Sequence, residues 1–414
     1  MEPSPGSLFH AFKAALDGRA AKSSLRKLTL HSPDSVDFSS NDFLSLSTSP
    51  AFRSLFIQQL AQNPSRPMGS GGSRLLDGNS AYAEELEQSI ASFHDAPSGL
   101  LFNSGFDANM AVFSCIPQPG DVILYDQHIH ASVHEGMRLS RAGKCLPFAH
   151  NSVSHLEAVL TDRLQDDPLL VAGTRNVFVA AESLYSMEGD VAPLERMVQV
   201  IESLLPRGNG YLIVDEAHST GLFGPKGGGI VQELGLSSRI FARLHTFGKA
   251  LTSHGAIVLC SPLTREYMIN YARSLIYTTA MPFPTLASIC AAYELMSRGE
   301  TEPLRIQLRA LIRHFSASLN GLLTQRPQLP SILQMRHHAN SPIISLQTPY
   351  PRELASFCQE AGFAVRPIMP PTIPAGTERV RICLHAGNTI SEIDRFAKVL
   401  ESWVVMRQRN VPSL

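Results

Sequence analysis

The stretch that most constrains the fold is residues 211–261, in which apolar runs alternate with polar residues placed where the runs end. The first run, 211–214, stops at a polar turn that carries Asp215 and His218. A later run leads into a turn that carries Lys249, and another apolar run follows it. Short apolar runs bounded by turn residues predict buried strands of an α/β sheet. Because chemistry in such sheets gathers at the carboxyl ends of the strands, we expect these polar residues to share one site.

A lysine enclosed by apolar strands is either an unusual core residue or a functional amine. Burial lowers the pKa of a lysine, and a neutral amine can attack a carbonyl group. With an aspartate for a pyridine nitrogen and a histidine for the ring hydroxyl, Lys249 has the partners that pyridoxal phosphate requires. The alternative is a helicase-like DEAH box beside an unrelated lysine, which the absence of a Walker A pattern from the sequence disfavours.

Other polar turns follow the strands that we predict earlier in the chain. A small-residue turn opens a helical run at Gly105 and Phe106, and its free N–H groups make both residues candidates for a cofactor phosphate. His128, His130 and His134 follow the next strand. These histidines invite a metal interpretation, but no carboxylate or cysteine completes a recognised set. A histidine over a flat cofactor ring is the preferred interpretation.

The alternation of strands with helical stretches predicts an α/β chain with a mainly parallel sheet that helices cover on both faces. Two prolines interrupt a helical run within 271–284, and the chain then changes to a long helical stretch, 286–323, and short strands. We therefore predict an N-terminal segment (1–48, with an amphipathic helix over 7–30), a large cofactor-binding domain (49–284) and a smaller α+β domain (285–414).

Composition disfavours several classes of function. The formal net charge of −1 favours neither nucleic acid nor an anionic membrane as a partner. No apolar run approaches the roughly 18 residues of a membrane span, and no secretory signal is evident, so we expect a cytoplasmic protein. The ending Ser413-Leu414 lacks the basic residue of a peroxisomal S-K-L address, which leaves peroxisomal import as the weaker alternative. The six cysteines form no C-x-x-C pair, and we expect reduced thiols.

A series of motifs resembles one family, the α-oxoamine synthases, from about residue 10 to residue 400. The motifs include FSSNDFLSL, GSGGSRLLDGNS, LFNSGFDANMAVF, DQHIHAS, YSMEGDVAPL, VDEAHSTGLFG, TFGKA, IYTTAMP and PPTIPAGTERVR. The family consists of fold-type I pyridoxal phosphate enzymes that join an amino acid to an acyl-CoA with loss of CO2. The sequence is most similar to the 8-amino-7-oxononanoate synthase branch, in biotin biosynthesis. The resemblance therefore implies a transferase that uses L-alanine and pimeloyl-CoA.

The resemblance also implies roles for individual residues. Around the cofactor ring it places Lys249 as the covalent lysine and general base, Asp215 at the pyridine nitrogen, His218 at the ring hydroxyl and His130 on the ring face. It implies further cofactor contacts for Gly105, Phe106, Ser186 and Thr246, and, across a homodimer with shared active sites, for Thr278 and Thr279. It implies substrate contacts for Arg26, Thr372 and Arg381.

One position departs from the family pattern. Met369 stands before Pro370-Pro371-Thr372, where the family has an arginine, although Arg366 lies nearby in the sequence. The acyl donor is therefore open between pimeloyl-CoA and a neutral, longer or polyketide-derived thioester. A non-catalytic scaffold subunit and an aminotransferase of the same fold are further alternatives. The first would be expected to lack Lys249, and the second does not fit the motifs GSGGSR and PPTIPAGT.

Overall fold

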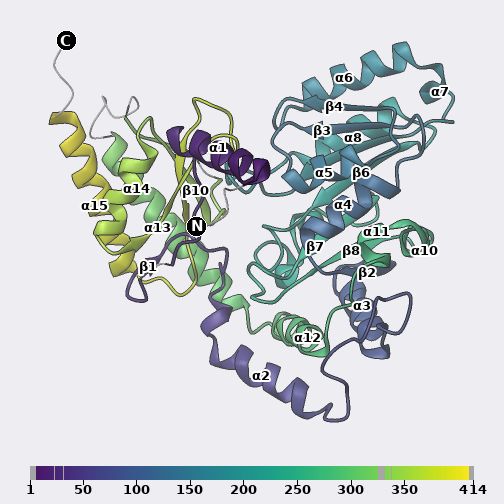
Figure 1. The fold of residues 1–414 in the computed structure, drawn as a ribbon, viewed down its shortest axis with the longest axis horizontal. Coiled ribbons are helices and arrows are strands. Elements are labelled where there is room, and N and C mark those ends of the chain that lie inside the picture. Colours follow the sequence, from purple (N-terminus) through teal and green to yellow (C-terminus); the bar gives the residue numbers. More distant parts are fainter. Residues whose placement is uncertain (1–5, 23, 31, 325–331, 337, 410–414) are drawn as a thin grey trace. The chain divides into compact units, whose positions relative to one another are not determined.

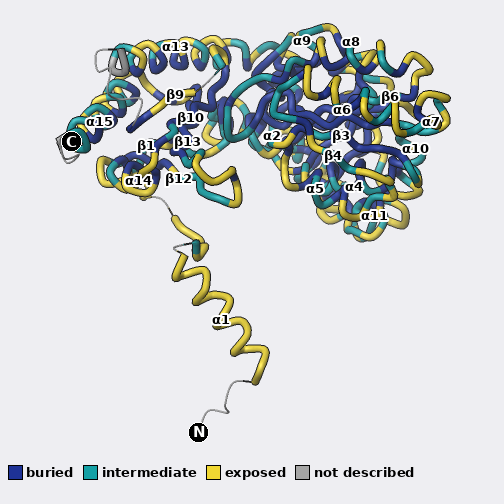
Figure 2. The backbone as a smooth tube through the Cα atoms, turned by 90° about the horizontal axis from the view of Figure 1, so that it is seen from above, coloured by how far each residue is buried: buried dark blue, intermediate teal, exposed yellow. Residues whose placement is uncertain are grey.

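The computed structural model describes residues 6–22, 24–30, 32–324, 332–336 and 338–409. The chain divides into two compact units, residues 1–35 and 36–414. In the first unit, helix α1 covers Ser7–Ala21, and none of its residues is buried (Figure 2). The helix is shorter than the predicted 7–30, because the N–H and the hydroxyl of Ser24 both donate to the carbonyl of Arg19 and close its last turn.

Within the described residues, the second unit is built on a seven-stranded sheet in the order β2-β8-β7-β6-β5-β3-β4 (Figure 1). Neighbouring strands are parallel from β7 to β4, and β8 is antiparallel to both β2 and β7. The predicted mainly parallel sheet is thus confirmed. The strands are β2 (Ser98–Phe102), β3 (Val122–Asp126), β4 (Lys144–Phe148), β5 (Val177–Glu182), β6 (Gly210–Asp215), β7 (Ala242–Thr246) and β8 (Ala256–Cys260).

Alternate residues of the central strands pack into two different cores. Val179 and Val214 belong to a core that includes α6 and α8, whereas Ala180 and Ile213 belong to a core with α4 and α5. This alternation means that both faces of the sheet are covered, as its apolar strands predicted. The helices of this part are α3 (Ala81–Phe93), α4 (Gly105–Cys115), α5 (Ala131–Arg138), α6 (Val153–Asp166), α7 (Pro168–Val171), α8 (Leu194–Leu204), α9 (Ile230–Glu233), α10 (Pro262–Tyr271) and α11 (Arg273–Ile276), with the 3-10 turn η2 (Pro225–Gly227).

The long helical stretch predicted over 286–323 is wrong in one respect, because it is two helices. Helix α12 covers Phe283–Ser297 and α13 covers Glu302–Thr324. Between them Gly299 has a φ of +76°, a left-handed conformation that ends a helix and that glycine adopts without strain. Helix α12 packs against α2 (Pro50–Ala61), which follows the 3-10 turn η1 (Leu46–Thr48).

A smaller antiparallel sheet, β12-β13-β10-β9, forms in the described part of the C-terminal region. Trp403 and Phe396 of the last helix are completely buried in the core beside it. A two-residue strand near the start of this unit, β1, pairs in parallel with β11. The elements are β1 (Val36–Asp37), β9 (Gln334–Arg336), β10 (Ile343–Gln347), β11 (Phe363–Ala364), β12 (Arg366–Ile368), β13 (Arg379–Cys383), α14 (Pro351–Glu360) and α15 (Ile390–Arg409).

The predicted division at 48/49 and 284/285 stays a prediction, and the two compact units meet at 35/36. Across the described ranges, every helix is too short or too polar to cross a membrane. All six cysteines are free thiols, four of them buried.

Candidate active site

A cavity of about 220 Å³ lies where β5, β6 and β7 end, against the first turn of α4. Seven of the residues singled out in the sequence line it together: Gly105, Phe106, His130, Asp215, His218, Thr246 and Lys249. They come from strands and turns that are distant in the sequence but adjacent in the sheet. The expectation that the polar strand ends share one place therefore holds for these seven positions.

Asp215 is the last residue of β6, and its carboxylate is fixed by two donors. The Asn109 side chain donates to Oδ2 at 2.7 Å, and the N–H of Ala217 donates to Oδ1 at 2.9 Å. Asn109 in turn donates to the hydroxyl of Ser132 at 3.0 Å. Because N–H donors stabilise a carboxylate, this arrangement holds an oriented negative charge at the cavity wall.

Lys249 follows β7 and carries the basic amine of the cavity. Burial lowers the pKa of Lys249, and the charge of Arg381 adds to this effect, whereas Asp215 opposes it. A lowered pKa increases the fraction of neutral amine near neutral pH. The lysine thus has the chemistry that the sequence predicted, that of an amine able to act as a nucleophile or as a base.

Two histidines complete the polar wall. His218 is buried, and its Nδ1 has no hydrogen-bond partner among the described residues. Burial, followed by the charges of Lys249 and Arg381, lowers its pKa well below the usual value. His130 precedes α5, and its Nδ1 lies 2.7 Å from the Ser132 hydroxyl, which fixes the ring at the cavity edge. The unpartnered nitrogen of His218 indicates a binding site, because buried polar atoms in proteins are normally paired.

The first turn of α4 forms an anion site on the same cavity. The Ser104 hydroxyl accepts from the N–H of Asp107, which leaves the earlier N–H groups of the helix without intrahelical acceptors. Gly105 must be a glycine here, because a Cβ built on it would lie 2.5 Å from Cγ2 of Thr246. The backbone of the turn and Thr246 can thus both approach a phosphate closely.

These features together fit pyridoxal phosphate. Lys249 provides an amine for the aldehyde, Asp215 an acceptor for a pyridinium N–H, and the turn at Gly105 a cradle for the phosphate. The unpartnered Nδ1 of His218 is left for a polar group of the ring.

Two further predicted residues, Ser186 and Arg381, lie together beside this cavity rather than on its wall. The Arg381 guanidinium donates to the carbonyl of Ser186 at 2.6 Å and to Oδ1 of Asn41 at 2.8 Å. Arg381 is buried, and these acceptors are neutral. A buried cation held by neutral groups is suited to receive an anion.

Two residues with predicted substrate contacts, Thr372 and Arg26, are not among those that line the cavity. Thr372 lies in the loop after β12, where its N–H donates to the carbonyl of Met369 at 3.1 Å. Arg26 belongs to the separate unit of residues 1–35. The roles that the resemblance implied for these two residues stay predictions.

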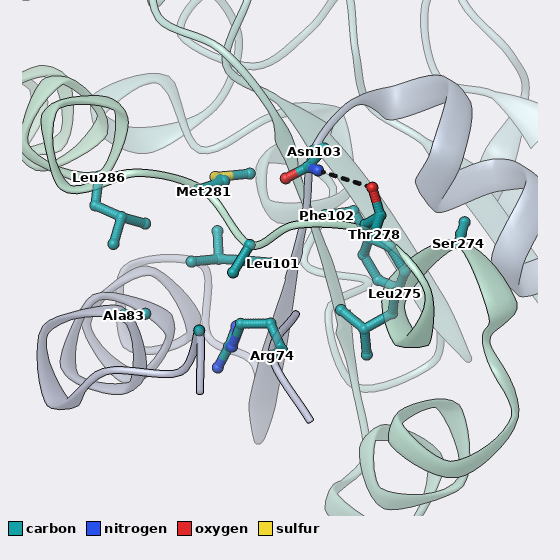
Figure 3. Close-up of a pocket in the computed structure, with 12 residues that line it drawn as sticks. Arg74, Ala83, Leu101, Phe102, Asn103, Ser274, Leu275, Thr278, Met281 and Leu286 are labelled. Carbon is teal, nitrogen blue, oxygen red and sulfur yellow. Dashed lines mark hydrogen bonds between the residues drawn. The ribbon is translucent and has the colours of Figure 1, made fainter. Parts of the chain in front are cut away.

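Thr278 and Thr279 also lie away from the main cavity. Thr278 lines a second cavity of about 20 Å³, the size of a water molecule, together with Arg74, Asn103 and Met281 (Figure 3). Asn103 donates to the Thr279 carbonyl at 2.8 Å and lies 3.5 Å from the Thr278 hydroxyl. The threonines are therefore tied to the strand that leads into the anion site, although they are not on its wall.

The three histidines that suggested a metal point to different surroundings. His130 lies on the cavity, His128 stacks on His150 at 4.2 Å, and His134 meets the edge of Tyr125. Among the described residues, no group of three or more His, Cys, Asp or Glu side chains is arranged to hold a metal ion.

Among the cavity-lining residues that were not given a role from the sequence are Asn109, Glu182 and His254. Asn109 lies one helical turn after Gly105, so helical spacing from the predicted anion turn could have identified it. Glu182 is the last residue of β5, so the rule that polar residues at strand ends gather at one edge of the sheet could have identified it. His254 follows Lys249 in a loop, and no local pattern marks it.

The fold and the cavity define a pyridoxal phosphate enzyme of fold type I. Residues 33–400 match the family model described as aminotransferase class I and II. Over 405 residues the chain is 60% identical to 8-amino-7-oxononanoate synthase of Emericella nidulans, with 98% of each chain covered. The chain belongs to the α-oxoamine synthases, within the aminotransferase class I and II family, and is a pyridoxal phosphate-dependent acyltransferase.

Two more distant proteins are also similar to this chain. Aminoacyl transferase sphA of Aspergillus fumigatus is 38% identical, with 95% of this chain and 87% of that protein covered. Among solved structures, serine palmitoyltransferase of Sphingomonas wittichii has a TM-score of 0.80 at 23% identity, with 99% and 100% of the two chains covered. The second likeness supports the fold.

Proposed function

We propose that this protein condenses L-alanine with pimeloyl-CoA and releases CO2 and CoA, giving 8-amino-7-oxononanoate for biotin biosynthesis. The observation that carries the proposal is the arrangement of Lys249 and Asp215 on the wall of one cavity, with the buried cation of Arg381 beside it. The identity of 60% to the Emericella nidulans synthase supports the choice of substrates.

The proposed chemistry uses Lys249 as the proton carrier. When bound, pyridoxal phosphate supplies an electron sink for charge that develops at the amino-acid Cα. Lys249 removes the Cα proton, which its lowered pKa favours. The Cα electron pair then forms a bond to the acyl carbonyl carbon, and the C–S bond breaks as CoA leaves as a thiolate. The carboxyl group departs as CO2, and Lys249 returns a proton to Cα.

The other residues hold the reactants in place. We assign the amino-acid carboxylate to Arg381, since this buried cation has neutral partners in Ser186 and Asn41. Asp215 keeps the ring nitrogen protonated, and its two hydrogen bonds keep its carboxylate oriented. We assign a ring-oxygen contact to His218, ring stacking to His130, and substrate contacts in the assembled enzyme to Arg26 and Thr372.

A second candidate function changes only the acyl donor. Met369 occupies the position where the family has an arginine, which removes one candidate cation for the free carboxylate of pimelate. Under this second candidate function, a neutral, longer or polyketide-derived acyl thioester replaces pimeloyl-CoA.

A CoA-release assay distinguishes the two candidates. The purified protein with pyridoxal phosphate receives L-alanine and either pimeloyl-CoA or a neutral acyl-CoA of the same chain length. We expect CoA release to be at least about tenfold faster with pimeloyl-CoA. With the neutral donor, the protein group that binds the pimelate carboxylate is left without its partner, which costs more than about 1.4 kcal/mol. Faster release with the neutral donor would contradict pimelate as the substrate, and Met369→Arg would then be expected to restore the preference for it.

We also propose a homodimer in which Thr278 and Thr279 reach the phosphate site of the partner subunit. The exposed apolar side chains of Leu75, Leu76 and Tyr277 support an interface in this region. Light scattering after size exclusion tests the dimer, and a monomer would contradict shared active sites.

A cytoplasmic location and the division into segments 1–48, 49–284 and 285–414 are further proposals. Fluorescent fusions that leave the C-terminus free test the location against peroxisomal import.

A further inference from the structure

Two carboxyl groups end neighbouring strands beside the cavity. Glu182 is the last residue of β5, Asp215 is the last residue of β6, and the two are paired in register. Adjacent strands lie about 4.8 Å apart, and both side chains line the cavity. Two buried carboxyl groups on neighbouring strand ends disfavour each other's ionisation, and a proton on one of them relieves this repulsion.

The hydrogen-bond donors decide which of the two keeps the proton. The Asp215 carboxylate accepts from the Asn109 side chain and from the N–H of Ala217. The Oε1 atom of Glu182 is buried and has no hydrogen-bond partner in the part of the chain that the structure describes. Because N–H donors stabilise the ionised form of a carboxyl group, the donors at Asp215 favour the negative charge there rather than at Glu182.

The wider surroundings of Glu182 act in the same direction. Burial raises the pKa of Glu182 well above its usual value, and the charges of Asp215, Asp126 and Glu188 raise it further, while Lys249 opposes them. The Tyr185 hydroxyl accepts from the backbone N–H of Glu182 at 3.3 Å, and Glu182 lines the cavity.

We propose that Glu182 is a protonated carboxylic acid in the native enzyme, and that its O–H donates a hydrogen bond to an acceptor atom of the cofactor or substrate in the cavity. Only the identity of this ligand rests on the proposed function. Glu182 adds a donor without adding a second negative charge beside Asp215. Neighbouring strand ends thus supply opposite hydrogen-bonding roles, an acceptor at Asp215 and a donor at Glu182.

The protonation state can be measured without an activity assay. A protonated carboxyl group has an infrared C=O stretch that an ionised carboxylate lacks. The difference spectrum between the holoenzyme and its Glu182→Gln variant at pH 7 should therefore contain a protonated-carboxyl band that the variant has lost. Glu85→Gln, a change at an exposed glutamate of α3, should give no such band. A difference spectrum that shows only the loss of an ionised carboxylate would overturn the proposal.

The pH titration of the visible absorbance of bound cofactor supplies a second measurement. Gln replaces a neutral acid by a neutral amide, so the titration midpoint should move by less than about 0.3 pH units. If Glu182 were ionised, removing its charge near Lys249 would lower the midpoint by about one unit. Asp215→Asn is the positive control, because it removes the charged member of the pair.

The donor role is tested by the affinity for pyridoxal phosphate, measured by fluorescence quenching. Glu182→Ala should weaken binding about tenfold, whereas Glu182→Gln, which keeps an N–H donor, should stay within about threefold of the wild type. If the wild type and the alanine variant bind pyridoxal phosphate equally well, Glu182 does not act as a donor. Failure of CoA release from pimeloyl-CoA would contradict the proposed function and leave all three of these measurements interpretable.

Discussion

Two buried carboxyl clusters of this enzyme differ in how completely their hydrogen bonds are satisfied. Glu87, on α3, accepts from Arg74, from Arg265 and from the N–H of Leu101, at 2.6, 2.7 and 2.8 Å. At the cavity, one carboxyl oxygen of Glu182 has no hydrogen-bond partner among the residues that the structure describes. A satisfied cluster holds elements together, whereas an unsatisfied one has hydrogen-bonding capacity left for a ligand. The difference separates a structural site from a functional site without reference to any relative.

The largest expected effect comes from a substitution in the functional site, at Lys249. Lys249→Ala should slow CoA release by about 10³-fold or more, because it removes the general base and the amine that binds the cofactor. Its free energy of unfolding without cofactor should equal or exceed that of the wild type, since a buried amine is removed. Urea denaturation and the release assay measure the two quantities. Lys144→Ala, at an exposed lysine, is the control, and a comparable loss of activity there would contradict the assignment.

The second prediction concerns the structural cluster around Glu87. Glu87→Gln leaves Arg74 and Arg265 without their counter-charge and should lower the free energy of unfolding by about 3 kcal/mol. The kcat per folded molecule should stay within about threefold of the wild type. Glu85→Gln on the exposed face of the same helix should change neither quantity. A selective loss of kcat with unchanged stability would show that the cluster serves the reaction.

His150 is an intermediate case, in which the contribution of a buried ion pair to stability depends on pH. The His150 ring lies 2.9 Å from both Asp126 and Asp190. Burial alone would lower the pKa of His150, but these two carboxylates outweigh it and raise the pKa to about 10. A raised pKa in the folded state stabilises the protein fully below the unfolded value of about 6.5, and the contribution is lost as pH rises towards 10. His150→Phe, which keeps an aromatic ring, should cost about 2 kcal/mol at pH 6 and progressively less up to pH 10. A cost independent of pH would mean that the ring acts by packing alone.

The smallest expected effect concerns the anion turn. Gly105→Ala should weaken pyridoxal phosphate binding about tenfold, because the new Cβ lies 2.5 Å from Cγ2 of Thr246. Thr246→Ser removes this methyl group and keeps the hydroxyl, so the double variant should regain most of the affinity. If the double variant binds as weakly as Gly105→Ala, the steric explanation is wrong.

The sequence predicted much of the cavity, for a reason that is local. Asp215, His218 and Lys249 follow apolar runs directly, and the topology of a parallel sheet brings such strand ends to one edge. The turn at Gly105 was predictable in the same way. The family resemblance added roles for His130 and Arg381 that no local pattern contains.

The features that were missed depend on contacts between distant parts of the chain. The protonation state of Glu182 depends on its register with Asp215 and on the absence of a donor, and the sequence contains neither fact. The satisfied cluster at Glu87 joins Arg74 to Arg265, which no periodicity predicts. The helix break at Gly299 was locally visible as a glycine, but a glycine within a helical pattern is often tolerated.

The pairing of β1 with β11 has a consequence for the order in which the chain folds. The strands of the seven-stranded sheet are complete once the ribosome has released residue 260, so this sheet can form during synthesis. Val36 and Asp37, in contrast, have no partner strand until Phe363 and Ala364 have been made. Because such a long loop must close late and slowly, the earliest strand of this unit is expected to be among the last to find its place on a nascent chain.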